Sequence, residues 1–422
     1  MKLLKLTRLA IAAGALALMT AGATFAADPL GTDDGTQLSM WVRAGLKIRV
    51  DPLVDAYNAS HKNHINLTYI PTDDYQAKVG AAAAANALPD VFSADVVLMP
   101  NWGSAGLFQD LTSRINALPN IDKVAQAAID VSTWDGKKYG MPFIADLSIW
   151  VWNKKLFKAA GLDPEKGPTS LAEFAADARA VAKLGNGVSG TFWGGSCGGC
   201  EFFTWFPIAW ASGGDIMNLE GTESHANSDI WQEIYKTFRS MAEDGTALMP
   251  DTKTELGPTW TSYFGKGNIG VMPMPASFSD ITGGSLPLED FGVTPISGLK
   301  DGQSTLVGGD AIGVSRDSKL TDAAWNFIAW IQSDAAQIDV VAKNGGVVTR
   351  SDLADNKYSA ADPRLVIFNQ VIGKGQTPKS LNVGPSFLDG QGPWVQLLQD
   401  MVFGDASKLE ADNAAINDSL NP

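Results

Sequence analysis

The cysteines of this chain lie in one glycine-rich stretch that could carry redox, metal or binding chemistry. Cys197 and Cys200, the two cysteines among 422 residues, are separated by two glycines, and Glu201 and Phe202 follow at once. A Cys-x-x-Cys pair can be a thioredoxin-like redox motif, but that motif normally opens a helix in a small domain. A zinc site would lack two ligands, because no histidine lies near the pair. We expect a structural disulfide, with the redox motif as the alternative.

A disulfide between Cys197 and Cys200 would act locally. Closing so short a loop contributes less stability than the ~3 kcal/mol assigned to a loop of about 15 residues. It would instead hold the glycine-rich turn and orient the residues that follow, beginning with Glu201 and Phe202. We therefore interpret the stretch as the wall of a pocket.

Aromatic side chains beside polar ones form a second set of candidates among the 13 tryptophans of the chain. An indole has a flat apolar face, while Asp, Glu, Asn and Arg make charge-assisted hydrogen bonds. Together they match the C–H face and the hydroxyl rim of a pyranose ring. A single tryptophan is more often a core residue than a ligand contact. The combinations that favour a sugar site are Trp41 with Arg43, Asp95 with Trp102, and Trp193 with Glu201.

The charge balance and the motif content exclude several other functions. Lys and Arg number 32 against 46 Asp and Glu, a net charge of −14, which excludes nucleic-acid binding by bulk electrostatics. The sequence has no His-Glu-x-x-His motif, no nucleophile elbow and no phosphate-binding P-loop. We expect no catalytic residue, no metal and no cofactor. A carboxylate pair for glycoside cleavage stays open, because acidic residues are plentiful.

The first residues have the three-part pattern of a secretory signal peptide. Basic residues occur in Met1–Arg8, an apolar run follows over Leu9–Met19, and small residues lead to Ala26. The apolar run is shorter than the roughly 20 residues that a bilayer span needs. We expect a signal peptide over residues 1–26, cleaved near Ala26, and a periplasmic mature protein. No cysteine follows the apolar run, so we expect no lipid anchor.

The segments that follow alternate between strand and helix patterns. Residues 36–43, 65–70 and 89–92 favour strands, and 51–60 and 75–86 favour helices. Further along, a capping box at Ser170 begins one helix and Thr321 begins another. Residues 269–275 and 311–315 favour short buried strands. This order predicts an α/β fold, in which helices cover the faces of a parallel sheet.

A series of motifs resembles the extracellular solute-binding proteins of carbohydrate ABC importers, the family of maltose-binding protein. The resemblance covers nearly all of the mature chain. Each motif is weak alone, and their order and spacing carry the resemblance. The matching segments are Ala87–Asp95, Gly106–Leu111, Asp135–Phe143, Trp152–Phe157, Trp210–Asp215, Phe264–Met272, Gly308–Ser315 and Gly345–Arg350.

The resemblance implies a two-lobed periplasmic-binding-protein fold, in which hinge-linked α/β lobes surround a ligand cleft. The N-terminal lobe would comprise residues 28–144 and 306–349, and the C-terminal lobe residues 145–305 and 350–422. The implied function is the substrate-binding component of an ABC importer, which binds a mono- or oligosaccharide. It would act as a monomer and hand its ligand to the membrane permease subunits.

The resemblance also implies which residues contact the ligand. Asp95 would accept hydrogen bonds from hydroxyl groups, and Glu201 and Phe202 would contact the ligand just before the helix that contains Trp205. The remaining cleft residues would be Trp260, Met274, Gly309 and Asp310. One departure stands out: the family often has a tryptophan after the methionine-rich strand, where this chain has Pro275-Ala-Ser-Phe278.

Two further classes of function stay open. The protein could bind another solute, such as a polyol, a polyamine or a sugar phosphate, or it could be a secreted glycan-active enzyme. A sugar phosphate would need additional cationic groups, for which Arg43 and Arg350 are the candidates. An enzyme would release new reducing ends from oligosaccharides.

Overall fold

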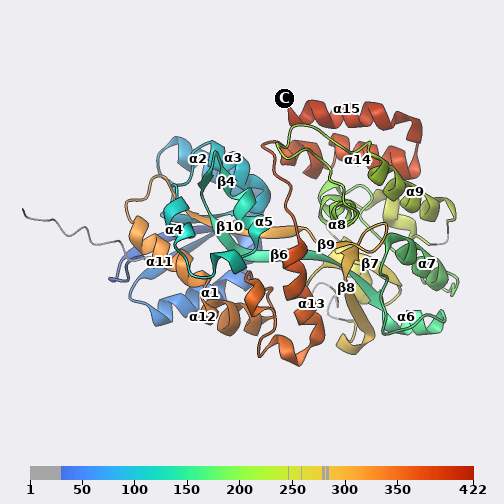
Figure 1. Cartoon of the computed structure of the whole chain (residues 1–422), viewed down its shortest axis with the longest axis horizontal. Helices are drawn as coiled ribbons and strands as arrows, with labels where there is room; N and C mark the ends of the chain where they lie inside the picture. The colour runs from blue at the N-terminus through green and yellow to red at the C-terminus, as the bar shows by residue number, and fades with distance from the viewer. Residues whose placement is uncertain (1–29, 246, 258, 278–280, 282–284) are drawn as a thin grey trace, which may run out of the picture.

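The computed structural model describes residues 30–422 except 246, 258, 278–280 and 282–284. The expected signal peptide and Phe278 lie outside the described residues. The elements form two groups, on the left and the right of Figure 1, and strands β6 and β10 run between them. None of the helices in the described ranges combines the length and the apolar character that a membrane span requires.

A mixed sheet runs through both groups in the strand order β2-β1-β3-β10-β6-β8-β9, with β7 paired to β6. Strand β1 is parallel to β2 and β3, as predicted, whereas β10 runs antiparallel to β3 and to β6. The strand bounds are Gln37–Arg43 (β1), His64–Ile70 (β2), Val91–Asp95 (β3), Met141–Asn153 (β6), Val271–Pro275 (β7), Phe291–Ser297 (β8), Gln303–Ser304 (β9) and Val307–Val314 (β10). A separate hairpin pairs Thr133–Trp134 (β4) with Lys137–Lys138 (β5).

The long strand β6 connects the two groups. Its residues up to Leu147 pair with β10, and from Ser148 onward it pairs with β7 and β8. The ladder between β6 and β10 is irregular at Asp310 and Ala311, beside Gly309, whose φ is +95°. A side chain at Gly309 would overlap the carbonyl oxygen of Ile144, so only glycine fits this crossing.

The helices of the first group cover both faces of β1, β2 and β3 (Figure 1). Their bounds are Lys47–Ser60 (α1), Tyr75–Ala84 (α2), Met99–Ser104 (α3), Thr112–Asn116 (α4), Gln126–Val131 (α5), Thr321–Ile331 (α11) and Asp334–Ala336 (α12). The predicted start of α1 at Asp51 is wrong, because the helix begins at Lys47 and tolerates Pro52 inside it. Proline is most common in the first helical turn, which had suggested the later start. Leu53, Val54 and Tyr57 lie on one face of this helix and are buried in the core.

The helices of the second group include α8, which begins at the cysteine pair and packs against α9 and the strands β6, β8 and β9. Their bounds are Lys154–Ala159 (α6), Leu171–Ala182 (α7), Gly198–Ala211 (α8), Asp229–Glu243 (α9), Pro363–Val371 (α13), Pro393–Leu398 (α14) and Leu409–Leu420 (α15). The predicted N-terminal cap of α7 is confirmed: the hydroxyl of Ser170 accepts a hydrogen bond from the backbone N–H of Glu173 at 3.2 Å. Phe206 of α8 packs edge to face against Trp231 and Trp394, which anchors α8 in the core.

Candidate functional site

The first turn of α8 is held by the predicted disulfide. Cys197 caps the helix, and its sulfur is bonded to Cys200 with the two Cα atoms 5.2 Å apart. The surrounding backbone is close: a Cβ added to Gly257 would lie 2.5 Å from the sulfur of Cys197. Gly257 also has a φ of +105°, which favours glycine. The disulfide prediction is therefore confirmed: the bond closes the first turn of α8, and Gly257 of the loop before residue 260 packs against it.

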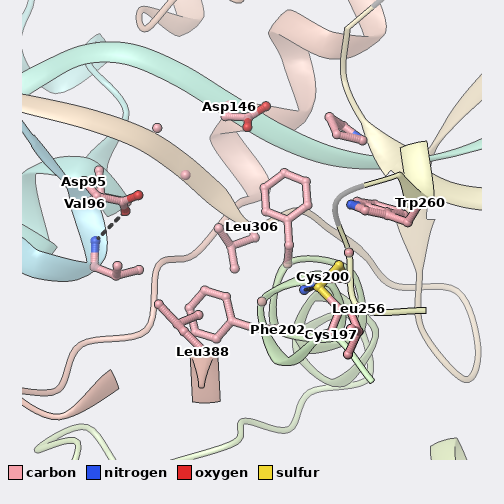
Figure 2. Close-up of a pocket in the computed structure, with 17 residues that line it drawn as sticks. Asp95, Val96, Asp146, Cys197, Cys200, Phe202, Leu256, Trp260, Leu306 and Leu388 are labelled. Carbon is pink, nitrogen blue, oxygen red and sulfur yellow. Dashed lines mark hydrogen bonds between the residues drawn. A yellow bond between two sulfur atoms is a disulfide. The ribbon is translucent and has the colours of Figure 1, made fainter. Parts of the chain in front are cut away.

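The disulfide forms part of the wall of a pocket with a volume of about 500 Å³. The first group of elements contributes Asp95 to one side, and the second group contributes Phe202 and Trp260 to the other (Figure 2). The pocket is lined by Asp95, Val96, Val97, Asp146, Cys197, Gly199, Cys200, Phe202, Phe203, Leu256, Gly257, Trp260, Pro275, Leu306, Gly308, Gly309 and Leu388.

The lining combines two kinds of chemistry. Asp95 and Asp146 supply carboxylates, and Phe202, Trp260, Leu306 and the disulfide supply apolar surface. Such walls suit a ligand with an apolar face and a rim of hydrogen-bond donors. The pocket volume lies in the range of small-molecule sites, from about 300 to 1,000 Å³.

A cluster of charges orients Asp95. Arg43 lies between two carboxylates, 3.1 Å from Asp95 and in direct ion-pair contact with Asp310. Asp310 is completely buried and also accepts a 2.6 Å hydrogen bond from the hydroxyl of Ser93. Burial raises the pKa of Asp95 to about 6, although Arg43 opposes the shift. Because Asp310 holds Arg43 in place, Arg43 in turn fixes the carboxylate of Asp95, whose side chain remains 30% exposed.

Glu201 does not lie on the pocket wall. It is 1% exposed, and neither carboxylate oxygen has a hydrogen-bond partner in the described part of the chain. Burial raises the pKa of Glu201 well above its usual value. The resemblance implied a ligand contact at Glu201, but α8 turns this side chain into the core, while Cys200 and Phe202 on either side line the pocket.

The structure places several other predicted contacts in the core. Trp102 packs among Tyr75, Phe92 and Phe108, and Trp193 packs against Trp205 and Phe238. Met274 is completely buried in β7. Trp41 is half-buried outside the pocket lining, with the ammonium of Lys78 over its ring at 5.7 Å. Of the tryptophans predicted to stack on a ligand, Trp260 is the one that lines this pocket.

The chain matches a known family over most of its length. Residues 52–366 match the family model described as bacterial extracellular solute-binding protein. The chain belongs to this family.

Curated relatives of this solute-binding protein are distant. A protein of Sinorhizobium fredii, named a probable amino-acid ABC transporter periplasmic-binding protein, is 27% identical over 54% of this chain and 53% of its own length. Three Brucella proteins named putative binding proteins match over 58% of their length, so the chain spans little more than half of these first relatives. The diacetylchitobiose binding protein of Streptomyces coelicolor is 22% identical over 76% of this chain and 75% of its own length.

Solved structures confirm the two-lobed fold. The cyclic alpha-maltosyl-1,6-maltose binding protein of Arthrobacter globiformis has a TM-score of 0.79 at 23% identity, covering 92% of this chain and 99% of its own. The sugar-binding protein MalE of Xanthomonas citri has a TM-score of 0.80 at 17% identity, covering 91% and 97% of the two chains. At these identities the likeness establishes the architecture, and the ligand has to be argued from the site.

Both arginines that the sequence suggested as anion contacts of this solute-binding protein are already neutralised. Arg43 is held by Asp95 and Asp310. Arg350 is almost fully buried and pairs with Asp334 and Asp352. Neither guanidinium is available to a ligand anion in this conformation.

Sequence reasoning missed part of the pocket lining. The most consequential omission is Asp146, which lies in the β6 crossing three residues after the Asp135–Phe143 motif. Its position at the crossing was the available signal, because a residue there borders both groups of elements. Leu256, Leu306 and Leu388 carried no signal, since isolated leucines are far more common in cores than in binding sites.

Proposed function

We propose that this solute-binding protein is the exported substrate-binding component of an ABC importer and binds a mono- or oligosaccharide in the pocket of about 500 Å³. One observation carries the proposal. Asp95 from the first group of elements faces Phe202, Trp260 and the disulfide from the second group across a shared cavity (Figure 2). Stacking on the aromatic side and hydrogen bonding on the carboxylate side fit a polyhydroxylated ring.

The two groups would act as hinged lobes. We assign residues 28–144 and 306–349 to the N-terminal lobe, and residues 145–305 and 350–422 to the C-terminal lobe. At the crossing, the backbone N–H of Ser148 donates to the hydroxyl of Thr305 at 2.9 Å, and the N–H of Leu306 donates to the hydroxyl of Ser148 at 3.0 Å. These bonds hold the crossing strands together while the lobes rotate. A ligand that contacts both lobes only in the closed form shifts the equilibrium toward closure.

The names of several relatives favour a saccharide. They include binding proteins for diacetylchitobiose and for arabinooligosaccharides, and solved structures with bound mannotriose or cycloalternan. A polyol is the second candidate, because a structural neighbour from Agrobacterium radiobacter is a complex with ribitol. Both ligand classes present hydroxyl groups to carboxylates, as the pocket requires.

The proposed setting follows from the family and the N-terminal sequence. An extracellular solute-binding protein works outside the cytoplasmic membrane and delivers its ligand to permease subunits. We assign residues 1–26 to a signal peptide cleaved near Ala26, without a lipid anchor, and we propose that the mature protein is a monomer. Membership in a solute-binding family favours binding over glycan cleavage.

A thermal-shift screen followed by calorimetry tests the proposal. The panel contains mono- and oligosaccharides, polyols, polyamines, amino acids and sugar phosphates. A ligand at about 100 times its Kd adds about 2.7 kcal/mol of stability, which is easily seen as a rise in Tm. Stabilisation by saccharides or polyols supports the proposal. Stabilisation by amines or amino acids alone refutes it, and new reducing ends in the incubated oligosaccharides would assign an enzyme instead.

A further inference from the structure

A second cavity, of about 470 Å³, borders the same strand crossing. It shares Asp146 with the first pocket, and the adjacent residues Pro275 and Ala276 line one cavity each. The start of α1 and the turn at residues 344–347 form its other walls. The lining residues are Gly45, Ile48, Arg49, Pro52, Phe143, Ile144, Ala145, Asp146, Ala276, Ser277, Val340, Val341, Asn344, Gly345, Gly346, Val347 and Leu365.

Arg49 differs from the other cations near the crossing. It is the one cationic side chain among the described lining residues of this cavity. The described part of the chain contains no hydrogen bond or ion pair to its guanidinium, although the side chain is half-buried. Its neighbour Lys47 is paired with Asp51 at 2.6 Å, and Arg43 is held by two aspartates. Arg49 therefore presents unpaired hydrogen-bond donors to the cavity, among the described residues, and Asp146 is the one carboxylate in the described lining.

The rest of the lining indicates which anion would fit. A guanidinium presents planar donors that match the two oxygens of a carboxylate. The described lining contains no lysine and no second arginine, and the carboxylate of Asp146 adds a negative charge of its own, so a monoanionic carboxylate held directly by Arg49 fits better than a dianionic phosphate. The remaining walls are mostly apolar, with Pro52, Val340 and Val341 among them, and can cover the C–H face of a sugar ring.

We propose that Arg49 binds a carboxylate of the ligand, so that the saccharide taken by this protein contains an acidic sugar, a uronate. The neutral part of the ligand lies in the first pocket between Asp95 and Trp260, and the ligand passes Asp146 to reach Arg49. This inference rests on the proposed function, and it assigns to Arg49 the anion contact that sequence reasoning had sought at Arg43 and Arg350.

The test compares acidic and neutral forms of the same saccharides by calorimetry. The probes are uronate disaccharides and their neutral methyl esters, with hexose 6-phosphates, inorganic phosphate and free amino acids as further anions. The variants are Arg49→Gln, Arg49→Lys and, as a control that removes the same charge elsewhere, Lys158→Gln at an exposed position of α6.

We expect the wild type to bind a uronate disaccharide more tightly than its ester. Arg49→Gln should lose about 10- to 100-fold in affinity for the acid, the range for a hydrogen bond to a charged group, with little change for the ester. Arg49→Lys should recover part of the loss, and Lys158→Gln should bind like the wild type.

The contrary outcomes separate this inference from the proposed function. Equal or tighter binding of the esters, unaffected by Arg49→Gln, overturns the inference and leaves saccharide binding in place. Tighter binding of hexose 6-phosphates or inorganic phosphate overturns the assignment of a carboxylate. Arg49-dependent binding of amino acids, with no response to any saccharide, overturns the proposed function.

Discussion

Replacing Glu201 by glutamine should remove one component of the pH dependence of stability. The carboxyl group of Glu201 is buried without a hydrogen-bond partner in the described chain, and burial raises its pKa well above the usual 4.5. The folded protein then keeps a proton that the unfolded chain releases. The stabilisation by this proton is complete below the unfolded pKa and is lost as the pH rises toward the folded pKa.

The magnitude follows from the linkage of one proton. Between the two pKa values, the free energy of unfolding falls by about 1.4 kcal/mol for each pH unit because of this group alone. Glutamine has nearly the same shape and does not titrate, so Glu201→Gln lacks this slope. A constant offset between the variants is also expected, because a buried amide without partners carries its own desolvation cost of about 1–3 kcal/mol.

Urea denaturation of both proteins at half-unit steps from pH 5 to 8 measures the effect. The free energy of unfolding of Glu201→Gln minus that of the wild type should rise with pH above 4.5 and level off at the folded pKa. Other shifted groups, such as Asp95, are present in both proteins and cancel in the difference. If the free energies of unfolding of the two proteins differ by a constant amount from pH 5 to 8, the reasoning is refuted. That result would mean that Glu201 finds a hydrogen-bond partner or is solvated.

Three further changes test the pocket and its frame. Asp95→Asn should weaken binding of the neutral ligand by about 10- to 100-fold. The affinity of the wild type should also fall as the pH drops through about 6, where Asp95 takes up a proton. Asp177 on α7 has a similarly raised pKa but lies outside the pocket, so Asp177→Asn should bind the ligand like the wild type in calorimetry. Replacing both cysteines by alanine should cost less than about 3 kcal/mol in urea denaturation but weaken ligand binding, and the variant should be insensitive to reductant. Gly257→Ala should destabilise by about 1–3 kcal/mol because its Cβ would meet the disulfide, while Gly199→Ala, with open space around it, should be neutral or slightly stabilising.

The disulfide and the capped helix could be predicted because their contacts are local. Cys197 and Cys200 are three residues apart, as are Ser170 and Glu173. The order of strands and helices likewise follows from patterns that span a few residues. The resemblance to solute-binding proteins added the two-lobed architecture, which the solved structures confirm.

The tryptophans show where local patterns stop being informative. Trp102, Trp193 and Trp260 were all candidate ligand contacts, and all three are largely buried, yet only Trp260 lines the pocket. The direction of each ring depends on how its element is rotated against its neighbours. No short stretch of sequence encodes that rotation.

By itself, the sequence determined the export pattern, the α/β order, the cysteine pairing and the polarity of the candidate pocket. Tertiary structure decided which charges a ligand can use. Arg43, at the end of β1, is neutralised by Asp310, 267 residues away, whereas Arg49, six residues later in α1, has no ion-pair partner among the described residues. Charge pairing depends on distance in space and on exclusion of water, so the fold had to bring the carboxylates together before Arg43 and Arg49 could be told apart.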